Sequence, residues 1–454
     1  MASKILIFLY SFILVFLFSY PVSAQTTRTP PYPYGNYSVT ISGNKQTAAS
    51  GSDNWPITWA VGDKQYSSWG DGGGFGSGYY DIGVAEITGR KAGTNLWFNN
   101  VYGKSYGILG VNGILWMWQC GEGSDAGAFK YQRLLRTTGT GALGSNWTAA
   151  NVTFDSSNNG NFFCPTFLQF GMDYSGARDS YVYTYAPINK SGSWNVQTPG
   201  EIVLFKIDKS KLTSSSSPQV SDFQFFTGLS GGLPSWGTAA NKKPVFSDSA
   251  NGVMRTSVSY NSSLKRYFLI TQQVTRSAPG GYIGIYDAPE PWGPWTTVLF
   301  KNAWDSSLNG LMNPDAIKTV FFNFSNKWAS GNNFVMVYTD RDNWASIEGY
   351  FNTGPVIATP TKTPTPIKSP TKTPTPIKSP TKTPTPIKSP TKTPTPGTSK
   401  PGDANGDNLV NGLDYLIWLS HYGEFVSGPA NGDFNNSGKV DGADYLIWLS
   451  NYGK

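Results

Sequence analysis

Two sets of oxygen-bearing side chains near the C-terminus have the spacing of metal ligands. Each set occupies positions 1, 3, 5, 9 and 12 of a twelve-residue loop, and the second set begins thirty residues after the first. Calcium takes about six to eight oxygen ligands, and a loop of this length can wrap them around one ion, with the backbone carbonyl of position 7 included. The expected ligands of two Ca²⁺ ions are Asp403, Asn405, Asp407, Leu409, Asn411 and Asp414, then Asp433, Asn435, Ser437, Lys439, Asp441 and Asp444.

Each of these loops runs into an apolar pattern, DYLIWLSHYG or DYLIWLSNYG, spaced to give a helix one buried face. Position 12 is Asp rather than the Glu of an ordinary EF-hand. Residues 401–454 resemble type I dockerins in both repeats. The resemblance implies a small α-helical module that folds around two calcium ions, has a pseudo-twofold surface and binds a cohesin domain of a scaffold protein. Positions 10 and 11, which help to set partner choice in that family, are Gly412-Leu413 and Gly442-Ala443 and leave the cohesin class open.

The large N-terminal region must do any chemistry without histidine. The only histidine of the chain is His421, in the tail, where we expect it to face solvent. Ser-His-Asp and Cys-His catalysis and histidine-ligated zinc are therefore excluded from residues 25–350. The Gly-rich stretch GDGGGFGSG at 70–78 lacks the Lys-Ser/Thr of a phosphate-binding loop. Carboxylates, tyrosines and arginines remain.

Paired carboxylates are the residues that glycosidic cleavage requires. One carboxylic acid protonates the leaving oxygen, and a second carboxylate activates water or attacks directly. Asp53 is the candidate base or nucleophile, and Glu122 is a candidate acid on a neighbouring group of strands. The remaining candidates are Asp173 and Asp179 as catalytic residues and Trp55, Trp59, Trp69, Asp71, Arg178 and Arg255 as substrate-binding residues.

Each candidate also has a structural interpretation. Asp53 and Asp71 can cap backbone amides in turns, and Asp173 and Asp179 can pair with Arg178. Tryptophans are usually core residues, although those close to carboxylates can stack on sugars.

The elements that must position these residues are short strands. Runs rich in Trp, Tyr, Phe, Val and Ile recur between Gly, Asn and Ser turns, in five groups of roughly sixty residues. Radial repetition of such groups predicts an all-β, five-bladed β-propeller, with a β-sandwich or β-helix as the alternative. Aromatic residues make up 15% of the chain, which favours strands and an aromatic-rich groove over a helical bundle.

Several segments resemble known propeller domains. SDNWPITWA with SWGDGGGF, TFLQFGMDYSGARDSYVYTY, SVSYNSSLKRYFL and YDAPEPWGPWTTV are similar to an uncharacterised family of bacterial propellers over about residues 35–350. Distant members of that family are described as endo-D-arabinanases, and the segments more loosely resemble five-bladed arabinanase and β-xylosidase families. The resemblance implies acids that converge on the axial groove, with Asp53 matching the first position. It also implies a polysaccharide substrate, with arabinofuranose-containing glycans as one class.

The ends and the linker define the domain organisation. Lys4, the apolar run 5–20 and Val22-Ser23-Ala24 predict a signal peptide over 1–24, with a retained membrane anchor as the alternative. A β-propeller at 25–355 and a Pro/Thr/Lys-rich linker at 356–400 precede the dockerin-like tail. Residues 351–400 hold eight lysines and no acid, so the net charge of +7 lies there, and no nucleic-acid partner is expected. We expect a secreted protein without a membrane span, held in the extracellular space or on a cell surface through its scaffold.

Export permits a disulfide between Cys120 and Cys164, the only cysteines, with two buried thiols as the alternative. Three functional classes stay open: a glycoside hydrolase, a polysaccharide lyase using tyrosine and arginine, and a non-catalytic carbohydrate-binding propeller. Since dockerins most often tether polysaccharide-degrading enzymes, the hydrolase is the leading interpretation.

Overall fold

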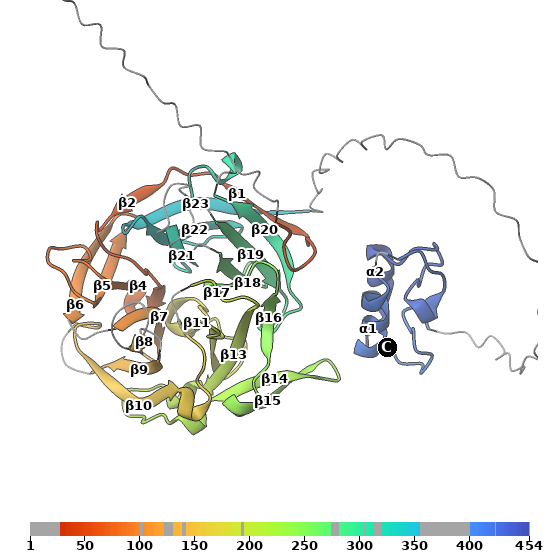
Figure 1. Cartoon of the computed structure of the whole chain (residues 1–454), viewed down its shortest axis with the longest axis horizontal. Helices are drawn as coiled ribbons and strands as arrows, with labels where there is room; N and C mark the ends of the chain where they lie inside the picture. Colours follow the sequence, from red (N-terminus) through yellow and green to blue (C-terminus); the bar gives the residue numbers. More distant parts are fainter. Residues whose placement is uncertain are drawn as a thin grey trace, which may run out of the picture.

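Five sheets arranged around one axis form the N-terminal domain (Figure 1). The computed structural model describes residues 28–99, 103–121, 130–138, 142–191, 195–273, 281–303, 305–312, 319–354, 400–422 and 424–453. The five-bladed β-propeller expected from the sequence is confirmed, and the sandwich and helix alternatives are excluded. Blades one and two are four-stranded: β3 (Ile57–Ala60), β4 (Lys64–Gly70), β5 (Ile82–Gly89) and β6 (Ala92–Asn99), then β7 (Gly103–Val111), β8 (Ile114–Gly121), β9 (Tyr131–Thr137) and β10 (Trp147–Asp155).

Blade three is the largest, because a hairpin and an extra edge strand extend it. Blade four is an ordinary four-stranded meander. Their strands are β11 (Thr166–Phe167), β12 (Tyr181–Pro187), β13 (Gly200–Asp208), β14 (Gln224–Ser230), β15 (Leu233–Gly237) and β16 (Pro244–Asp248), then β17 (Arg255–Asn261), β18 (Arg266–Gln272), β19 (Tyr282–Ala288) and β20 (Thr296–Asn302).

The N-terminal segment closes the ring by completing the fifth blade. That blade contains β21 (Thr319–Phe324), β22 (Asn333–Asp340) and β23 (Trp344–Thr353), and β23 pairs antiparallel with β1 (Tyr37–Ile41) and with β2 (Gln46–Ala48). Joining the two ends of the domain in one sheet removes the open edges that an incomplete ring would leave.

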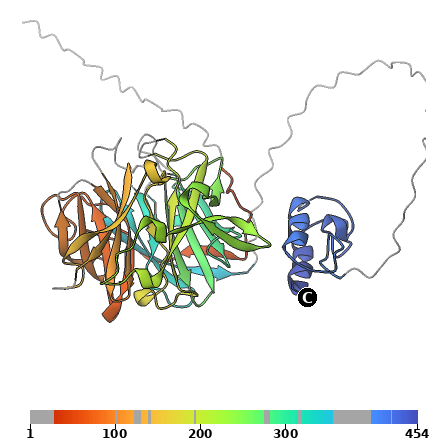
Figure 2. The ribbon, with the colours of Figure 1, turned by 90° about the horizontal axis from the view of Figure 1, so that it is seen from below.

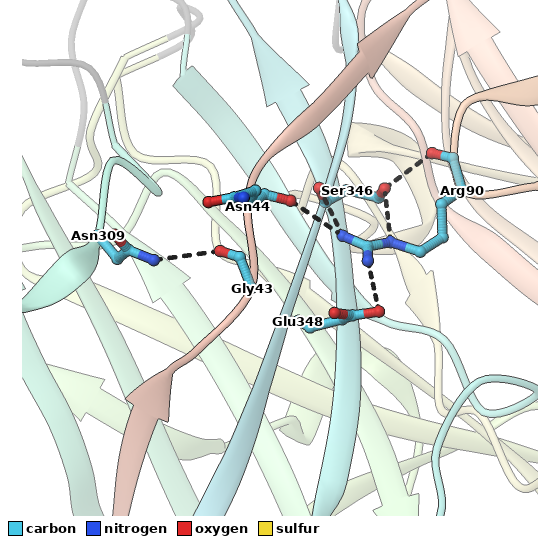
Figure 3. Close-up of polar contacts among 6 residues, drawn as sticks. All are labelled: Gly43, Asn44, Arg90, Asn309, Ser346 and Glu348. Atoms are coloured by element: carbon cyan, nitrogen blue, oxygen red, sulfur yellow. Dashed lines mark hydrogen bonds and ion pairs between the residues drawn. The ribbon is translucent and has the colours of Figure 1, made fainter.

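Arg90 ties blade one to this closing blade. It lies in the turn between β5 and β6, and its guanidinium pairs with Glu348 and donates to the carbonyls of Asn44, at 3.2 Å, and Ser346, at 3.4 Å. The Ser346 hydroxyl donates back to the Arg90 carbonyl at 2.7 Å (Figure 3). Asn309 lies in the loop between β20 of blade four and β21 of blade five. Its side chain donates to the carbonyl of Gly43 at 3.1 Å and so joins this loop to the same N-terminal segment.

Aromatic side chains fill the spaces between blades, which accounts for the high aromatic content. Trp118 of blade two stacks on Phe167 of blade three, with ring centroids 5.8 Å apart and planes inclined by 26°. Large buried rings of this kind supply much of the apolar burial that stabilises a propeller. Six tryptophans of the described propeller residues are buried in this way and are unavailable for ligands: Trp55, Trp69, Trp116, Trp118, Trp295 and Trp344.

Cys120 and Cys164 are both buried free thiols, so the disulfide favoured from the sequence is not formed. The Cys120 thiol donates to Gln132 Oε1 at 2.7 Å. Burial raises the pKa of the Cys164 thiol, and a hydrogen bond with Cys120 raises it further. The Cys164 thiol is therefore protonated and uncharged.

The C-terminal tail is a separate small helical module. It contains α1 (Gly412–Ser420), a 3₁₀ turn at Pro429–Asn431 and α2 (Gly442–Asn451), shown in blue in Figure 2. Its core is made by Ala404, Val410, Trp418, Phe434, Val440 and Trp448. Within the described parts of the chain, no helix is both long and apolar enough to cross a membrane.

Candidate active site at the propeller axis and the calcium loops

The innermost strands of the five blades start at the same end of the propeller. In blades one, two and four these strands are β3, β7 and β17, and a charged residue lies at or close to the start of each. Asp53 precedes β3, Lys104 is the second residue of β7, and Arg255 is the first residue of β17. Since the strands surround one axis, residues at their starts converge at the axial mouth.

Asp53 is held by the backbone of its own blade. Its N–H donates to the Gly70 carbonyl at 2.8 Å, and the Gly70 N–H donates to the Asp53 carbonyl at 2.7 Å. A Cβ on Gly70 would lie 3.0 Å from Asp53 Oδ1 and 2.8 Å from Cδ of Lys104. Glycine at this position therefore leaves room for the carboxylate and the lysine.

Asn54 connects Asp53 to the opposite side of the ring. Its side-chain Nδ2 donates to Asp53 Oδ1 at 2.6 Å, while its Oδ1 accepts from Arg255 Nη1 at 2.5 Å. Because an arginine can only donate, the arginine fixes which end of the Asn54 amide points to the aspartate. Asn54 has a left-handed backbone, with φ of 57°, and its N–H donates to the Thr339 hydroxyl at 2.9 Å. Side chains of blades four and five thus hold this strained residue, as is common at functional sites.

The environment of Asp53 changes its acidity. Burial raises its pKa from 3.8 to about 6, with smaller effects that lower it from Lys104 and Arg255 and that raise it from Asp71 and Asp342. A carboxylate with this pKa is ionised at neutral pH and is more basic than an ordinary aspartate.

Asp71 and Lys104 form an ion pair across blades one and two. Nearby, Tyr79 is 65% exposed, and burial of its hydroxyl together with the charge of Asp71 raises its pKa to about 12. Tyr79 is consequently a neutral hydroxyl at physiological pH. Asp71, which was predicted as a substrate-binding residue, therefore lies beside Asp53 at the mouth.

Sequence reasoning missed Asn54, Lys104, Tyr106 and Asp342. Tyr106 accepts from Arg255 Nη2 at 3.4 Å, and the guanidinium carbon lies 4.8 Å from the centre of its ring. Asp342 lies in the turn between β22 and β23 and is close enough to raise the pKa of Asp53. Lys104 and Tyr106 stand at the start of the inner strand of blade two, as Asp53 does in blade one. A search for polar residues at the start of each inner strand could have identified Lys104 and Tyr106 from the sequence.

Asp173, Arg178 and Asp179 lie away from this mouth. Asp173 accepts from the N–H of Gly113, in the turn that ends β7, whereas Lys104 lies at the start of the same strand. Arg178 pairs with Glu290 at 3.0 Å, and Asp179 accepts from the hydroxyl of Tyr183 at 2.6 Å. These contacts place the three residues toward the opposite end of the propeller from Asp53.

The predicted tryptophan platforms are mostly internal. Trp55 and Trp69 have no exposed surface, and their rings pack 6.0 Å apart beside Trp344 and Phe75. The Trp59 indole donates to Asp63 Oδ1 at 2.9 Å, at the far end of β3. The predicted acid Glu122 lies outside the described residues; the residue before it, Gly121, pairs with Gly103 at the Lys104 end of blade two.

The two loops of the tail bury carboxylates in matching positions. Asp403, Asp414, Asp433 and Asp444 are each at most 2% exposed. Within the described residues, no lysine or arginine pairs with any of these four. Asp414 accepts from the N–H of Ala404, at 2.8 Å, and of Asn411, also at 2.8 Å, so it joins the start of the loop to the start of α1. Two buried carboxylates in each loop, with amide or hydroxyl oxygens between them, fit a hard divalent cation such as calcium.

The two repeats also contact each other symmetrically. The Trp418 indole donates to the carbonyl of Asp441 at 3.0 Å, and the Trp448 indole donates to that of Asn411 at 2.8 Å. Each tryptophan therefore binds position 9 of the other loop. His421 directly follows α1, is half-buried and hydrogen bonds to Glu424 at 2.8 Å.

Comparisons with known proteins give one family match. Residues 401–452 match the model "Dockerin type I domain". No curated protein sequence is similar to the chain. An α-L-arabinofuranosidase from Podospora anserina is similar at 10% identity and a TM-score of 0.39, over 69% of this chain and 98% of that one. An arabinanase from Bacillus subtilis gives 12% identity and a TM-score of 0.37, over 68% and 96% of the two chains. The tail of this protein is thus a type I dockerin domain, carried by a five-bladed β-propeller.

Proposed function

We propose that the propeller is a glycoside hydrolase whose reaction takes place at the axial mouth. The observation that supports this most strongly is the carboxylate of Asp53. It has a raised pKa, lies among two cations and two further carboxylates, and is oriented through Asn54 by a buried arginine. Such differences between neighbouring carboxyl environments are what acid and base roles require.

Asp53 is the base in this proposal. Its carboxylate takes a proton from water as the water oxygen bonds to the anomeric carbon. The C–O bond to the leaving sugar breaks, and the leaving oxygen receives a proton from an acid, for which Glu122 is the sequence candidate. Asp71 pairs with Lys104, and its negative charge helps to keep the pKa of Asp53 high.

A lyase mechanism has less support at this mouth. Tyr79 would have to act as a base, yet its pKa is raised to about 12. Arg255 would have to bind a uronate carboxylate, yet it is 1% exposed and is bonded to Asn54 and Tyr106. Neutral glycans, with arabinofuranose-containing polymers among the first to test, are therefore the proposed substrates.

The tail is proposed to bind two calcium ions and, when folded, a cohesin domain. Asp403, Asp407, Asn405 and Asp414, with the Leu409 carbonyl and Asn411, would hold the first ion, and the matching residues of the second loop would hold the second. Calcium would neutralise the buried carboxylates that otherwise have only backbone and amide partners. In this proposal the protein is exported and is attached to a scaffold outside the cell.

The experiment compares the full chain with Asp53→Asn and Glu122→Gln on arabinan, xylan, galactan and polygalacturonate. Reducing sugar released by the parent and lost in both folded variants supports the proposal. Asp173→Asn is the matched control, because that carboxylate lies away from the mouth, and it should keep the activity. An unsaturated product would favour a lyase, and binding without any product would favour a non-catalytic module.

A further inference from the structure

A hollow lies at the outer wall of the propeller, between blades two and three. It has a volume of about 710 Å³ and is lined by residues of β10, β14 and the 3₁₀ turns at Ser156–Asn158, Val220–Asp222 and Ala239–Asn241. Ligand clefts commonly have volumes of about 300–1,000 Å³. Because β10 is the outermost strand of its blade, whereas β7 lines the axis, this groove is separate from the axial mouth (Figure 1).

The lining combines an apolar floor with uncharged polar walls. Val220 and Ala240 present apolar surface in the groove, and the buried rings of Phe154, Phe223 and Phe225 lie beneath it. No ionisable side chain belongs to the lining. Its amides and hydroxyls come from Asn151, Thr153, Asn158, Asn159, Gln219, Ser221 and Thr238.

Some of these polar groups are already fixed in place. Asn151 Nδ2 donates to Gln219 Oε1 at 2.7 Å, which joins the two blades across the groove. Both ends of the Asn158 amide are used, because Nδ2 donates to the Thr153 carbonyl at 2.8 Å and Oδ1 accepts from the Asp155 N–H at 3.0 Å. The groove is therefore already formed and braced across the two blades.

Other polar groups of the lining remain available. The hydroxyls of Thr153, Ser221 and Thr238 and the amide of Asn159 have no hydrogen-bond partner among the described residues. Two charged side chains beside the groove already have partners. Lys242 Nζ donates to the carbonyls of Asn159 and Ala239, at 2.8 and 3.1 Å, and Asp222 pairs with Lys211 at 3.2 Å.

We propose that this groove is a second carbohydrate-binding site, for a segment of an uncharged polysaccharide. Free hydroxyls and amides match sugar hydroxyls, and the apolar floor matches the C–H face of a sugar ring. An anionic polymer would lose water from its charges and meet no cation in the lining, since the neighbouring Lys242 is already bonded to two backbone carbonyls. A polymer chain held in the groove would stay close to the axial mouth. Its glycosidic bonds would then have a higher effective concentration at the mouth.

The test measures retention of the full chain by linear arabinan and xylan, with polygalacturonate as the anionic comparison. All proteins carry Asp53→Asn, so the polymers are not consumed. Thr238→Arg and Ser221→Trp each place a large side chain in the groove. Both positions are exposed and make no hydrogen bond that the change would remove. Thr94→Arg, at an exposed threonine of β6, the outermost strand of blade one, is the matched control.

We expect both groove variants to weaken retention on a neutral polymer by about tenfold, and Thr94→Arg to leave it unchanged. With Asp53 restored, turnover of short soluble oligosaccharides should stay the same in every variant, which separates this site from the mouth. Equal retention by a folded groove variant and its control would overturn the proposal. So would retention by polygalacturonate alone, or by none of the polymers. Because the two groove changes lie in different segments, misfolding of one still leaves the other as a test.

Discussion

Replacement of Asp53 by Asn should stabilise the folded propeller at neutral pH. The folded protein holds the Asp53 proton up to a pH of about 6, whereas the unfolded chain loses it near the ordinary value of 3.8. Between these values the folded state binds more protons than the unfolded state. The parent therefore loses stability as the pH rises from 4 to 6, and the loss persists above pH 6.

The size of this effect follows from the pKa shift. A shift of about two units corresponds to about 3 kcal/mol, at about 1.36 kcal/mol for each unit. Asn is close in size to Asp and can still accept the hydrogen bond from Asn54, but it carries no charge to desolvate. The difference in unfolding free energy between Asp53→Asn and the parent should rise from near zero at pH 4 to about 3 kcal/mol at pH 7.

Calorimetry and intrinsic fluorescence of the full chain between pH 4 and 8, with calcium in excess, measure this difference. Asp63→Asn provides a control of opposite sign, because hydrogen bonds from Lys327 and Trp59 lower the pKa of Asp63. That variant should lose stability relative to the parent as the pH rises through the acid range. A stability difference for Asp53→Asn that does not change with pH would refute the reasoning about its burial.

The remaining predictions concern activity, ring closure and the tail. If Asp53 is the base, kcat/KM should fall about tenfold per pH unit below a pH of about 6, and a pH profile with an acid limb near pH 4 would contradict the assignment. Arg90→Met should lower the unfolding free energy by about 1–3 kcal/mol, because it leaves Glu348 and two carbonyls without their partner; Lys64→Met, at a largely exposed ion pair, should change it by less than about 1 kcal/mol in a denaturant titration. Chelation of calcium should abolish cohesin binding and the helical circular dichroism of the tail, while the thermal unfolding transition of the propeller stays unchanged. Asp414→Asn should raise the calcium concentration needed for cohesin binding. A tail that stays folded and binds cohesin in the presence of chelator would contradict the calcium proposal.

The repeating elements of this protein were readable from the sequence because they depend on local patterns. Alternating apolar strands and Gly-rich turns indicated the groups that form the blades. In one such turn, between β3 and β4, Gly62 and Asp63 both have positive φ. The dockerin loops were equally readable, since their ligand spacing lies within twelve residues. The pairing of β1 with β23 could not be predicted from local patterns, because it joins segments about 300 residues apart in the chain.

The candidate site was only partly predictable for the same reason. Asp53 could be found from its place before the first strand of blade one. Its partners Lys104, Arg255 and Asp342 come from three other blades, and only the closed ring brings them near it. Asp173 and Asp179 looked equivalent in sequence, but they lie at the other end of the propeller. Trp55 and Trp69 lie near Asp53 along the chain, yet the alternation of strand faces turns them into the core.

The most direct test of the central claim measures the products of the full chain acting on arabinan, xylan and galactan, beside Asp53→Asn and Asp173→Asn. We expect oligosaccharides with ordinary reducing ends from at least one polymer. We also expect their loss in a folded Asp53→Asn protein that still binds the polymer, and their retention in Asp173→Asn. Undiminished hydrolysis by Asp53→Asn, or no product from any polymer with the folded parent, would contradict the proposal that the axial mouth cleaves glycosidic bonds.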